Sequence, residues 1–388
     1  HAVYAVGNRL SRTEVGLTST PIYTLIVPGF VEDILIVDYL GADYALLSMG
    51  ADGIGVVTLA DMALVTTVGV NFYQDNLTFT EGGGAILTGN IHEGTRGEIR
   101  SLLTDGTDLW IANEAYGIHK TALSNLFGGP VVEADGTLLI DAEVFTLLYA
   151  GENPWGGPRH MTMVGDRIFA AQGFMGMGIF DATTLAQVGG YNMYLDTNMH
   201  EDWFIQRDPA NEVQDVGGLY LDAATGMPDY RQASFEILEV WKGDVVAPTP
   251  WADFDRYGKY YYNARTVAVA DQGGTVIAYI AYGLGGLVAV DVTGYDTATS
   301  GSPLDASYLG YAPAVPAHGP DKPIGEQSQS LYPYFGAGML KEAGAVDVQV
   351  VGDKVYYTDH FAGLLVMGGA DDPAANWHGA SGTYDNDD

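Results

Sequence analysis

The sequence predicts an all-β protein built from one repeated sheet, and three observations lead to this prediction. A unit of three apolar strands recurs five times, a glycine stands at the same point of each unit, and no long amphipathic helix interrupts the units. The copies begin at Asp33, Glu98, His160, Arg265 and Val346. A recurring unit of three or four short strands is typical of a β-propeller, in which each copy is one blade.

The composition of the repeated segments favours strands over helices. β-Branched and aromatic residues dominate residues 276–282 (VIAYIAY) and 355–361 (VYYTDHF), and such residues suit a pleated surface. Turn sequences such as Gly352-Asp353-Lys354 separate the first strand of a copy from the second, where a hairpin is expected. Each copy therefore predicts an antiparallel meander.

The number of blades follows from the glycine that opens the third strand of each copy. The interval from Gly176 to Gly286 is close to twice the preceding intervals, so it predicts one further, degenerate blade with insertions within residues 193–262. Six blades then account for the whole chain, residues 1–388, as a single domain. Seven blades are the alternative, with an extra blade around residues 76–89. The five glycines are Gly53, Gly117, Gly176, Gly286 and Gly363.

A propeller needs a device that closes its ring. The N-terminal segment, from Ala2 to about Val27, begins with an alternating apolar strand that belongs to none of the five copies. We expect it to supply outer strand material to the last blade. The alternative is donation of this strand to a neighbouring molecule, which would produce an assembly.

Charge and composition exclude some partners. The net charge is −33, from 49 acidic and 16 basic residues, which argues against nucleic acid and against an anionic membrane surface. A well-solvated surface explains this acidity, and adaptation to high salt is the alternative. The sequence contains no run of 18 apolar residues, so no membrane-spanning helix is predicted.

The chain has no cysteine. Disulfides, Cys-ligated zinc, iron–sulfur clusters and covalently attached c-type haem are therefore excluded. The absence of thiols is common among exported bacterial proteins. Together with a first residue, His1, that is not methionine, it leads us to expect a mature extracellular or cell-surface chain whose signal peptide has been removed.

The repeats resemble a known family, the LVIVD repeat. The first copy contains Leu35-Ile36-Val37-Asp38, and two later copies show the second half of the consensus, a glycine followed by an apolar strand that ends in Asp. These are residues 286–294 (GLVAVDVTG) and 178–184 (GIFDATT). The resemblance implies a propeller in an exported or surface protein of bacteria or archaea, and it suggests a multihaem cytochrome as a partner. It implies no particular activity.

Charged residues predicted at the channel mouth form a candidate metal site. The loops that enter the first strands and those that join the second strands to the third share one face of a propeller. Imidazole and carboxylate groups there suit a transition metal, and Asp-rich turns suggest Ca²⁺ as the alternative divalent ion. The structural alternative is a set of strut salt bridges, for example between Arg100 and Glu98. The candidate ligands are His160, His360, Asp347, Asp359 and Glu114, with the N-terminal His1 as a separate copper-chelating candidate.

Two further segments are candidates for binding. An aromatic cluster predicts an exposed loop that could stack on a sugar or fill a protein interface through Trp251, Phe254, Tyr257 and Tyr260. Residues 312–334 are rich in Pro, Gly and Ser and predict a long loop, and such loops often carry function.

No catalytic motif accompanies these features, so we expect a binding or assembly module in an extracellular complex rather than an enzyme. A metal-dependent secreted enzyme with its site at the channel mouth and a carbohydrate-binding protein are the alternatives.

Overall fold

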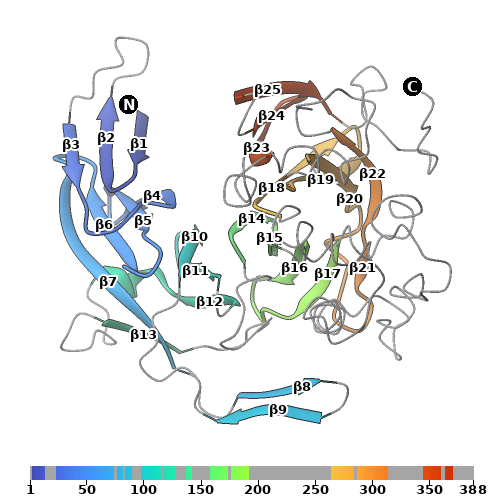
Figure 1. Cartoon of the computed structure of the whole chain (residues 1–388), viewed down its shortest axis with the longest axis horizontal. Coiled ribbons are helices and arrows are strands. Elements are labelled where there is room, and N and C mark those ends of the chain that lie inside the picture. Colours follow the sequence, from blue (N-terminus) through green and yellow to red (C-terminus); the bar gives the residue numbers. More distant parts are fainter. Residues whose placement is uncertain are drawn as a thin grey trace, which may run out of the picture. The chain divides into compact units, whose positions relative to one another are not determined.

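The computed structural model describes about half of the chain, and it divides into two compact units, His1–Met161 and Thr162–Asp388. Figure 1 labels the strands of each unit, which are described separately here. The structure describes residues 2–13, 23–73, 77–81, 84–89, 98–114, 117–127, 137–141, 158–173, 176–191, 264–283, 286–312, 344–359 and 363–369.

The first unit contains the sheets of the first two copies. The first copy forms β4 (Asp33–Tyr39), β5 (Ala42–Ser48), β6 (Ile54–Thr58) and β7 (Ala63–Tyr73), which pair antiparallel in that order. A later strand, β13 (Thr137–Asp141), adds to β7 in parallel. The second copy forms the antiparallel sheet of β10 (Ile99–Thr104), β11 (Asp108–Asn113) and β12 (Gly117–Ala122), followed by a 3-10 turn at Leu123–Phe127.

The N-terminal residues form a sheet of their own, which corrects the prediction that they only add strand material to the last blade. The strands β1 (Ala2–Val6), β2 (Arg9–Thr13) and β3 (Tyr23–Ile26) pair antiparallel in sequence order. One face of this sheet, with Val3, Ala5 and Leu10, packs on the core of the β4–β7 sheet. The sequence of β2 is largely polar, so the strand was not recognisable from its pattern.

The second unit contains the sheets of the last three copies. The third copy forms β14 (His160–Val164), where the two units join in sequence, β15 (Arg167–Ala171), β16 (Met177–Asp181) and β17 (Gln187–Tyr191). The fourth forms β18 (Thr266–Gln272), β19 (Thr275–Ala281), β20 (Leu287–Asp291) and β22 (Ser307–Ala312). The fifth forms β23 (Ala345–Val351), β24 (Lys354–Asp359) and β25 (Gly363–Gly368).

A short strand from the fourth copy completes the sheet of the third. The strand β21 (Leu304–Asp305) pairs in parallel with β17 through Gly189 and Gly190. The buried Arg167 fixes the same connection, because its guanidinium donates to the carbonyl oxygens of Asp296 and Ala298, each at 3.2 Å. The same guanidinium also pairs with Asp181 at 3.0 Å.

The all-β class and the five repeated sheets are thus confirmed. The glycine that opens each third strand has a left-handed φ in all five copies, between 76° at Gly286 and 92° at Gly117, which explains why glycine recurs there. Residues 77–81 and 84–89 form a separate two-stranded hairpin, β8 (Leu77–Glu81) and β9 (Gly84–Gly89). Residues 193–262 and nearly all of 312–334 lie outside the described residues, and the number of blades and the closure of the ring remain predictions.

Burial differs between the middle sheets and the two terminal ones. Central strands such as β15 and β19 are buried on both faces, as their continuous apolar sequences predict. In β24 buried residues alternate with less buried ones, so only one face of its sheet is covered. The covered face packs on the fourth sheet through Val348, Val355 and Tyr357.

Candidate functional site

Pairs of backbone hydrogen bonds, called latches below, join a loop glycine of one sheet to the start of the next sheet. They lie at the positions that the sequence predicts at the mouth of the channel. In the first unit, the amide and carbonyl of Gly50 each bond to Ile99 at 3.0 Å. In the second unit, Gly173 pairs in the same way with Ala264, and Gly283 pairs with Ala345. Each glycine stands in the loop after the second strand, and each partner stands where the next first strand begins. In each of these three pairs, the loop after a second strand therefore meets the entrance of a first strand in the adjacent sheet.

The latches also show which sheets are neighbours. Because Gly173 is bonded to Ala264, the third sheet lies directly beside the fourth, although residues 192–263 come between them in sequence. In the same way, the first sheet lies directly beside the second, although the β8–β9 hairpin comes between them in sequence. A blade formed by either intervening segment would not separate these sheets.

In the second copy, Glu114 occupies the position of the latch glycine. Gly50, Gly173 and Glu114 each stand three residues before the glycine that opens the third strand. The Glu114 side chain is 3% exposed, and each of its carboxylate oxygens accepts one bond from an arginine. Arg100 Nε donates to one oxygen and Arg159 Nη2 donates to the other, both at 2.5 Å.

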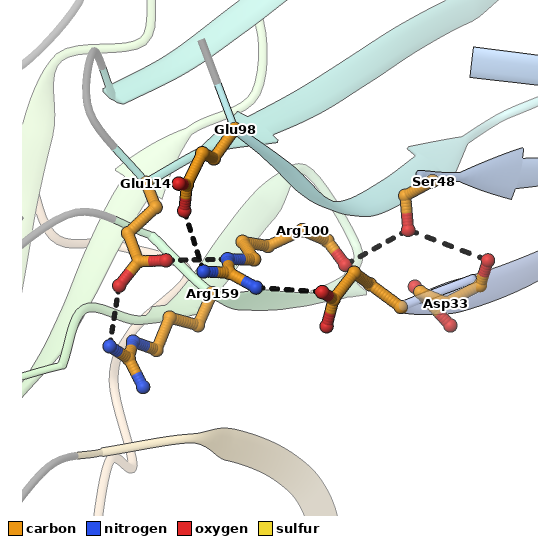
Figure 2. A network of polar contacts seen from close by, with 7 residues as sticks. Asp33, Ser48, Glu98, Arg100, Glu114 and Arg159 are labelled. Atoms are coloured by element: carbon orange, nitrogen blue, oxygen red, sulfur yellow. Dashed lines mark hydrogen bonds and ion pairs between the residues drawn. The ribbon is translucent and has the colours of Figure 1, made fainter. Parts of the chain in front are cut away.

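Arg100 lies among three carboxylates (Figure 2). Besides Glu114, its guanidinium pairs with Glu32 at 2.8 Å and with Glu98 at 2.6 Å. Burial of Arg100 lowers its pKa, but the charges of Glu114, Glu32 and Glu98 act in the opposite direction and raise the pKa above its usual value. The strut salt bridge expected between Arg100 and Glu98 is thus confirmed, as part of a larger network.

Hydroxyl groups extend this network between the first and second sheets. Ser101 Oγ on β10 donates to a carboxylate oxygen of Asp33 on β4 at 2.8 Å. Ser48 Oγ on β5 donates to the carbonyl of Arg100 at 3.0 Å, and it also lies 3.4 Å from the carbonyl of Asp33 (Figure 2). Asp33 also accepts from the amide of Ile34 at 2.7 Å. These side chains carry the polar links between two sheets whose cores are apolar.

The predicted metal ligands fall into three groups. Glu114 is occupied by two guanidinium groups, which compete with a cation for its oxygens. His160 begins β14, Asp347 lies near the start of β23 and accepts from the amide of Val348, and the buried Asp359 ends β24. His1 and His360 lie outside the described residues. Within the described part of the chain, no group of three or more His, Asp or Glu side chains is arranged to hold a metal ion.

The chemistry of this site is that of a structural network. In the described part of the first unit, two guanidinium groups and three glutamates neutralise most of one another's charge. The aromatic candidates Trp251, Phe254, Tyr257 and Tyr260 lie outside the described residues. Sequence reasoning missed Arg159, although it precedes the first strand of the third copy as Arg265 precedes that of the fourth. That repeated position was the available signal.

Comparison with known proteins leaves the family open. No protein-family model matches the chain, and no curated protein matches it. Among solved structures, BBS1N in complex with ARL6DN is 7% identical with a TM-score of 0.41, over 94% of this chain and 72% of that chain. The designed Ika8 protein is 6% identical with a TM-score of 0.39, over 94% of this chain and 82% of that one. BamB from Moraxella catarrhalis is 8% identical with a TM-score of 0.35, over 93% and 76%.

All three TM-scores lie below 0.5. Among the described residues, no helix has the length and hydropathy that a membrane span requires.

Proposed function

We propose that this chain is an extracellular β-propeller of the LVIVD-repeat type that serves as a binding and assembly module in a protein complex. The proposal rests on its repeated sheets, on the mutual pairing of charged side chains at the latch, and on apolar groups left exposed at the surface. Around Glu114, the first two copies carry salt-bridge struts at positions where the alternative, a metal-dependent enzyme, would need metal ligands.

The observation that carries the proposal is the conformation of Leu40. It lies at the tip of the β4–β5 hairpin with a left-handed φ of 54°, followed by Gly41 with a φ of 81°. Two positive φ angles define a turn that prefers Asn-Gly, because a left-handed residue with a large side chain is strained by about 1 kcal/mol. Leu40 is nevertheless 90% exposed and gains no burial in return.

The contrast with similar residues points to a contact partner. In the described part of the chain, the other non-glycine residues with a positive φ are Met62 and Leu185, and both are buried. Their strain is offset by packing within the fold. The strain of Leu40 is not, and strained apolar residues at the surface are candidates for a functional contact. Phe30, which is 72% exposed in the same unit, adds a second apolar group.

The proposal includes a closed ring of six blades. The outer face of the β1–β3 sheet presents Tyr4, Val6 and Ile26 to solvent, and the outer face of the β23–β25 sheet presents Leu364 and Val366. The central strands β15 and β19 of the third and fourth sheets, in contrast, are buried on both faces. We propose that the N-terminal sheet is a blade in its own right and that each of these two faces is covered in the assembled protein.

Placement outside the cell is supported by the absence of cysteine and by the net charge of −33. The family assignment is supported by a structural role for its consensus aspartate. Asp181 accepts from the amides of Thr183 and Thr184, and Asp291 accepts from the amide of Thr293, so the motif shapes the turn after the third strand. A multihaem cytochrome is the partner that the family resemblance suggests.

Isolation of the tagged full chain from the extracellular fraction of its native host tests the proposal. We expect the wild-type chain to elute with a second polypeptide at fixed stoichiometry, as measured by light scattering and mass spectrometry. Leu40→Asn should lose that polypeptide while the protein becomes more stable, because Asn suits the turn better than Leu. A wild-type chain that is strictly monomeric at 41.3 kDa would contradict the proposal.

A further inference from the structure

Two aspartates face each other beside the turn at the tip of the β4–β5 hairpin. In the register of these strands Asp38 lies opposite Asp43, and both side chains are exposed. The carbonyl of Asp43 accepts from the amide of Leu59 at 3.0 Å. Leu59 follows β6, which pairs with β5 on the side away from β4. The two aspartates are therefore not joined by backbone hydrogen bonds, and in such pairs the side chains come closest across an antiparallel ladder.

The charges of this aspartate pair are not compensated within the described residues. Asp38 accepts from the amide of Gly41 at 3.0 Å, which is a bond within the turn. In the described part of the chain, no ion pair involves Asp38 or Asp43. Like charges directly opposite each other destabilise an antiparallel pair. The hairpin thus carries an electrostatic cost in addition to the backbone strain of Leu40.

Aromatic packing holds the stem of the hairpin on its other face. Tyr39 stacks on Phe127 with the ring centroids 4.0 Å apart, and Tyr44 meets the same ring edge-on at 4.8 Å. These rings pack against the apolar core that the first and second sheets share. Because side chains alternate along a strand, the aspartate pair lies on the opposite face. The packed stem fixes the register, so Leu40 and the aspartate pair keep their places at the surface.

The charges of the chain favour a basic partner for this surface. A second copy of the chain would bring the same net charge of −33, which like-charge repulsion disfavours. The lysines and arginines outside the described residues each have an Asp or Glu within four positions in the sequence. Positive charge is therefore not concentrated in any of these segments. A separate polypeptide with clustered basic residues complements the hairpin better than a second copy or a segment of this chain.

We propose that the tip of the β4–β5 hairpin docks on a basic partner protein, which takes Leu40 into an apolar pocket and places Lys or Arg side chains against Asp38 and Asp43. This inference rests on the proposed assembly function and names the chemistry of its partner. A cation beside the two carboxylates relieves their repulsion, and burial of Leu40 offsets its backbone strain. Both costs of the free hairpin thus favour the complex.

A fluorescently labelled peptide of alternating leucine and lysine is the probe. One control peptide has serine in place of leucine, and another has glutamate in place of lysine. We expect saturable binding of the leucine–lysine peptide to the full chain, measured by fluorescence anisotropy. The serine–lysine peptide should bind about tenfold more weakly, because it cannot bury Leu40 against apolar groups, and the glutamate peptide should not bind.

Variants of the hairpin locate the binding. Asp38→Asn/Asp43→Asn should weaken binding of the leucine–lysine peptide about fivefold or more, and Leu40→Asn about tenfold. Asp271→Asn/Asp353→Asn is the matched control, because it removes two exposed charges from the corresponding hairpins of the fourth and fifth copies. Asp271 accepts from the amide of a turn glycine at 2.9 Å, as Asp38 does. This control variant should bind as the wild type does.

The stability of the free chain gives a second readout. Because the facing charges repel each other, Asp43→Asn should raise the melting temperature while it weakens peptide binding. Leu40→Asn should do the same, since Asn suits a turn with positive φ angles better than Leu does. Misfolding would lower both quantities, so changes of opposite sign are specific to this surface.

Several results would overturn the inference. The first is equal peptide binding by the wild type and Asp38→Asn/Asp43→Asn, and the second is an equal loss in the matched control. A lower melting temperature of Leu40→Asn would show that a segment of this same chain already covers the tip. A wild-type dimer that Leu40→Asn converts to a monomer would make a second copy the occupant. Stabilisation by calcium chloride that requires Asp38 and Asp43 would make the pair a cation site.

The extracellular complex separates this inference from the assembly function. If the complex forms but resists both Asp38→Asn/Asp43→Asn and about 0.5 M salt, which screens exposed charges, the basic partner is wrong while the assembly function stands. If the wild-type chain forms no complex at all, the assembly function fails as well.

Discussion

Glu114 stands at the point of its repeat where Gly50 stands in the preceding one. Gly50 uses its backbone to reach the next strand, and Glu114 uses its carboxylate to hold two arginines. The same position of the repeat thus connects neighbouring elements through backbone hydrogen bonds in the first copy and through salt bridges in the second.

Removal of the Glu114 carboxylate should destabilise the fold. In Glu114→Ala, Arg159 loses its partner and Arg100 loses its buried one, while both side chains remain mostly covered. Because both arginines retain some solvent contact, we expect a loss of about 1–3 kcal/mol in the free energy of unfolding by urea. Glu98→Ala is the control, since Glu98 is half exposed and its pair should contribute below about 1 kcal/mol. Equal losses in the two variants would refute this ranking.

The latch glycine Gly50 should not tolerate a side chain, although there is space for one. A Cβ at Gly50 would meet no atom within 4 Å, but its φ of 56° is left-handed. Gly50→Ala should therefore lower the free energy of unfolding by about 1 kcal/mol through backbone strain alone. Gly301 is equally open and has no left-handed φ, so Gly301→Ala should be neutral or slightly stabilising in the same urea titration. A neutral Gly50→Ala would show that the loop can adopt another conformation.

Tyr357 should make stability fall at alkaline pH. Its burial, and then the charge of Asp359, raise the pKa of Tyr357 to about 12. A tyrosine in the unfolded chain ionises near pH 10, at about the ordinary value. The pKa of Tyr357 is higher in the folded chain than in the unfolded chain, so the neutral phenol stabilises the fold. This contribution to the free energy of unfolding is complete below about pH 10 and is lost as pH rises toward 12. Tyr357→Phe should reduce the alkaline loss by about 2 kcal/mol, measured by urea unfolding at pH 9 to 12.

Tyr356→Phe is the matched control for that titration, because it removes a neighbouring hydroxyl and leaves Tyr357 in place. A wild-type curve that falls with pH no more steeply than the curve of Tyr357→Phe would contradict the assignment.

Val366 and Val65 provide a paired test of ring closure, because each is 53% exposed on a strand of its own unit. If the outer face of the β23–β25 sheet is covered by another sheet, Val366→Lys buries a charge and should lose about 2 kcal/mol or more. Val65 lies on no proposed closing face, so Val65→Lys should change stability by less than about 0.5 kcal/mol. Thermal and urea unfolding of both variants measure the difference, and similar effects would count against closure at this face.

The five repeated sheets could be predicted from the sequence because their signals are local. Apolar strands, two-residue turns and a left-handed glycine such as Gly117 all lie within one copy. The N-terminal sheet was missed because β2 (RLSRT) is stabilised by neighbours on both sides rather than by its own apolar pattern. Tertiary context of this kind overrides strand propensity.

The site was harder to predict, since its chemistry depends on which charges meet. Glu114 was expected among metal ligands, but Arg159 reaches it from far along the chain. Sequence identifies the charged positions of a repeat without showing which opposite charge comes closest. Arg100 was expected in struts, because Glu98 is near it in sequence.

The parallel pairing of β21 with β17 has a consequence for the order of events during synthesis. The sheet of the third copy remains incomplete until Leu304 has emerged, after three strands of the next copy have been made. Arg167 likewise lacks its carbonyl acceptors until Asp296 and Ala298 have been made. In a nascent chain that ends before β21, the edge of β17 has not yet gained this pairing strand. We therefore expect the third and fourth sheets to complete their folding together rather than one after the other.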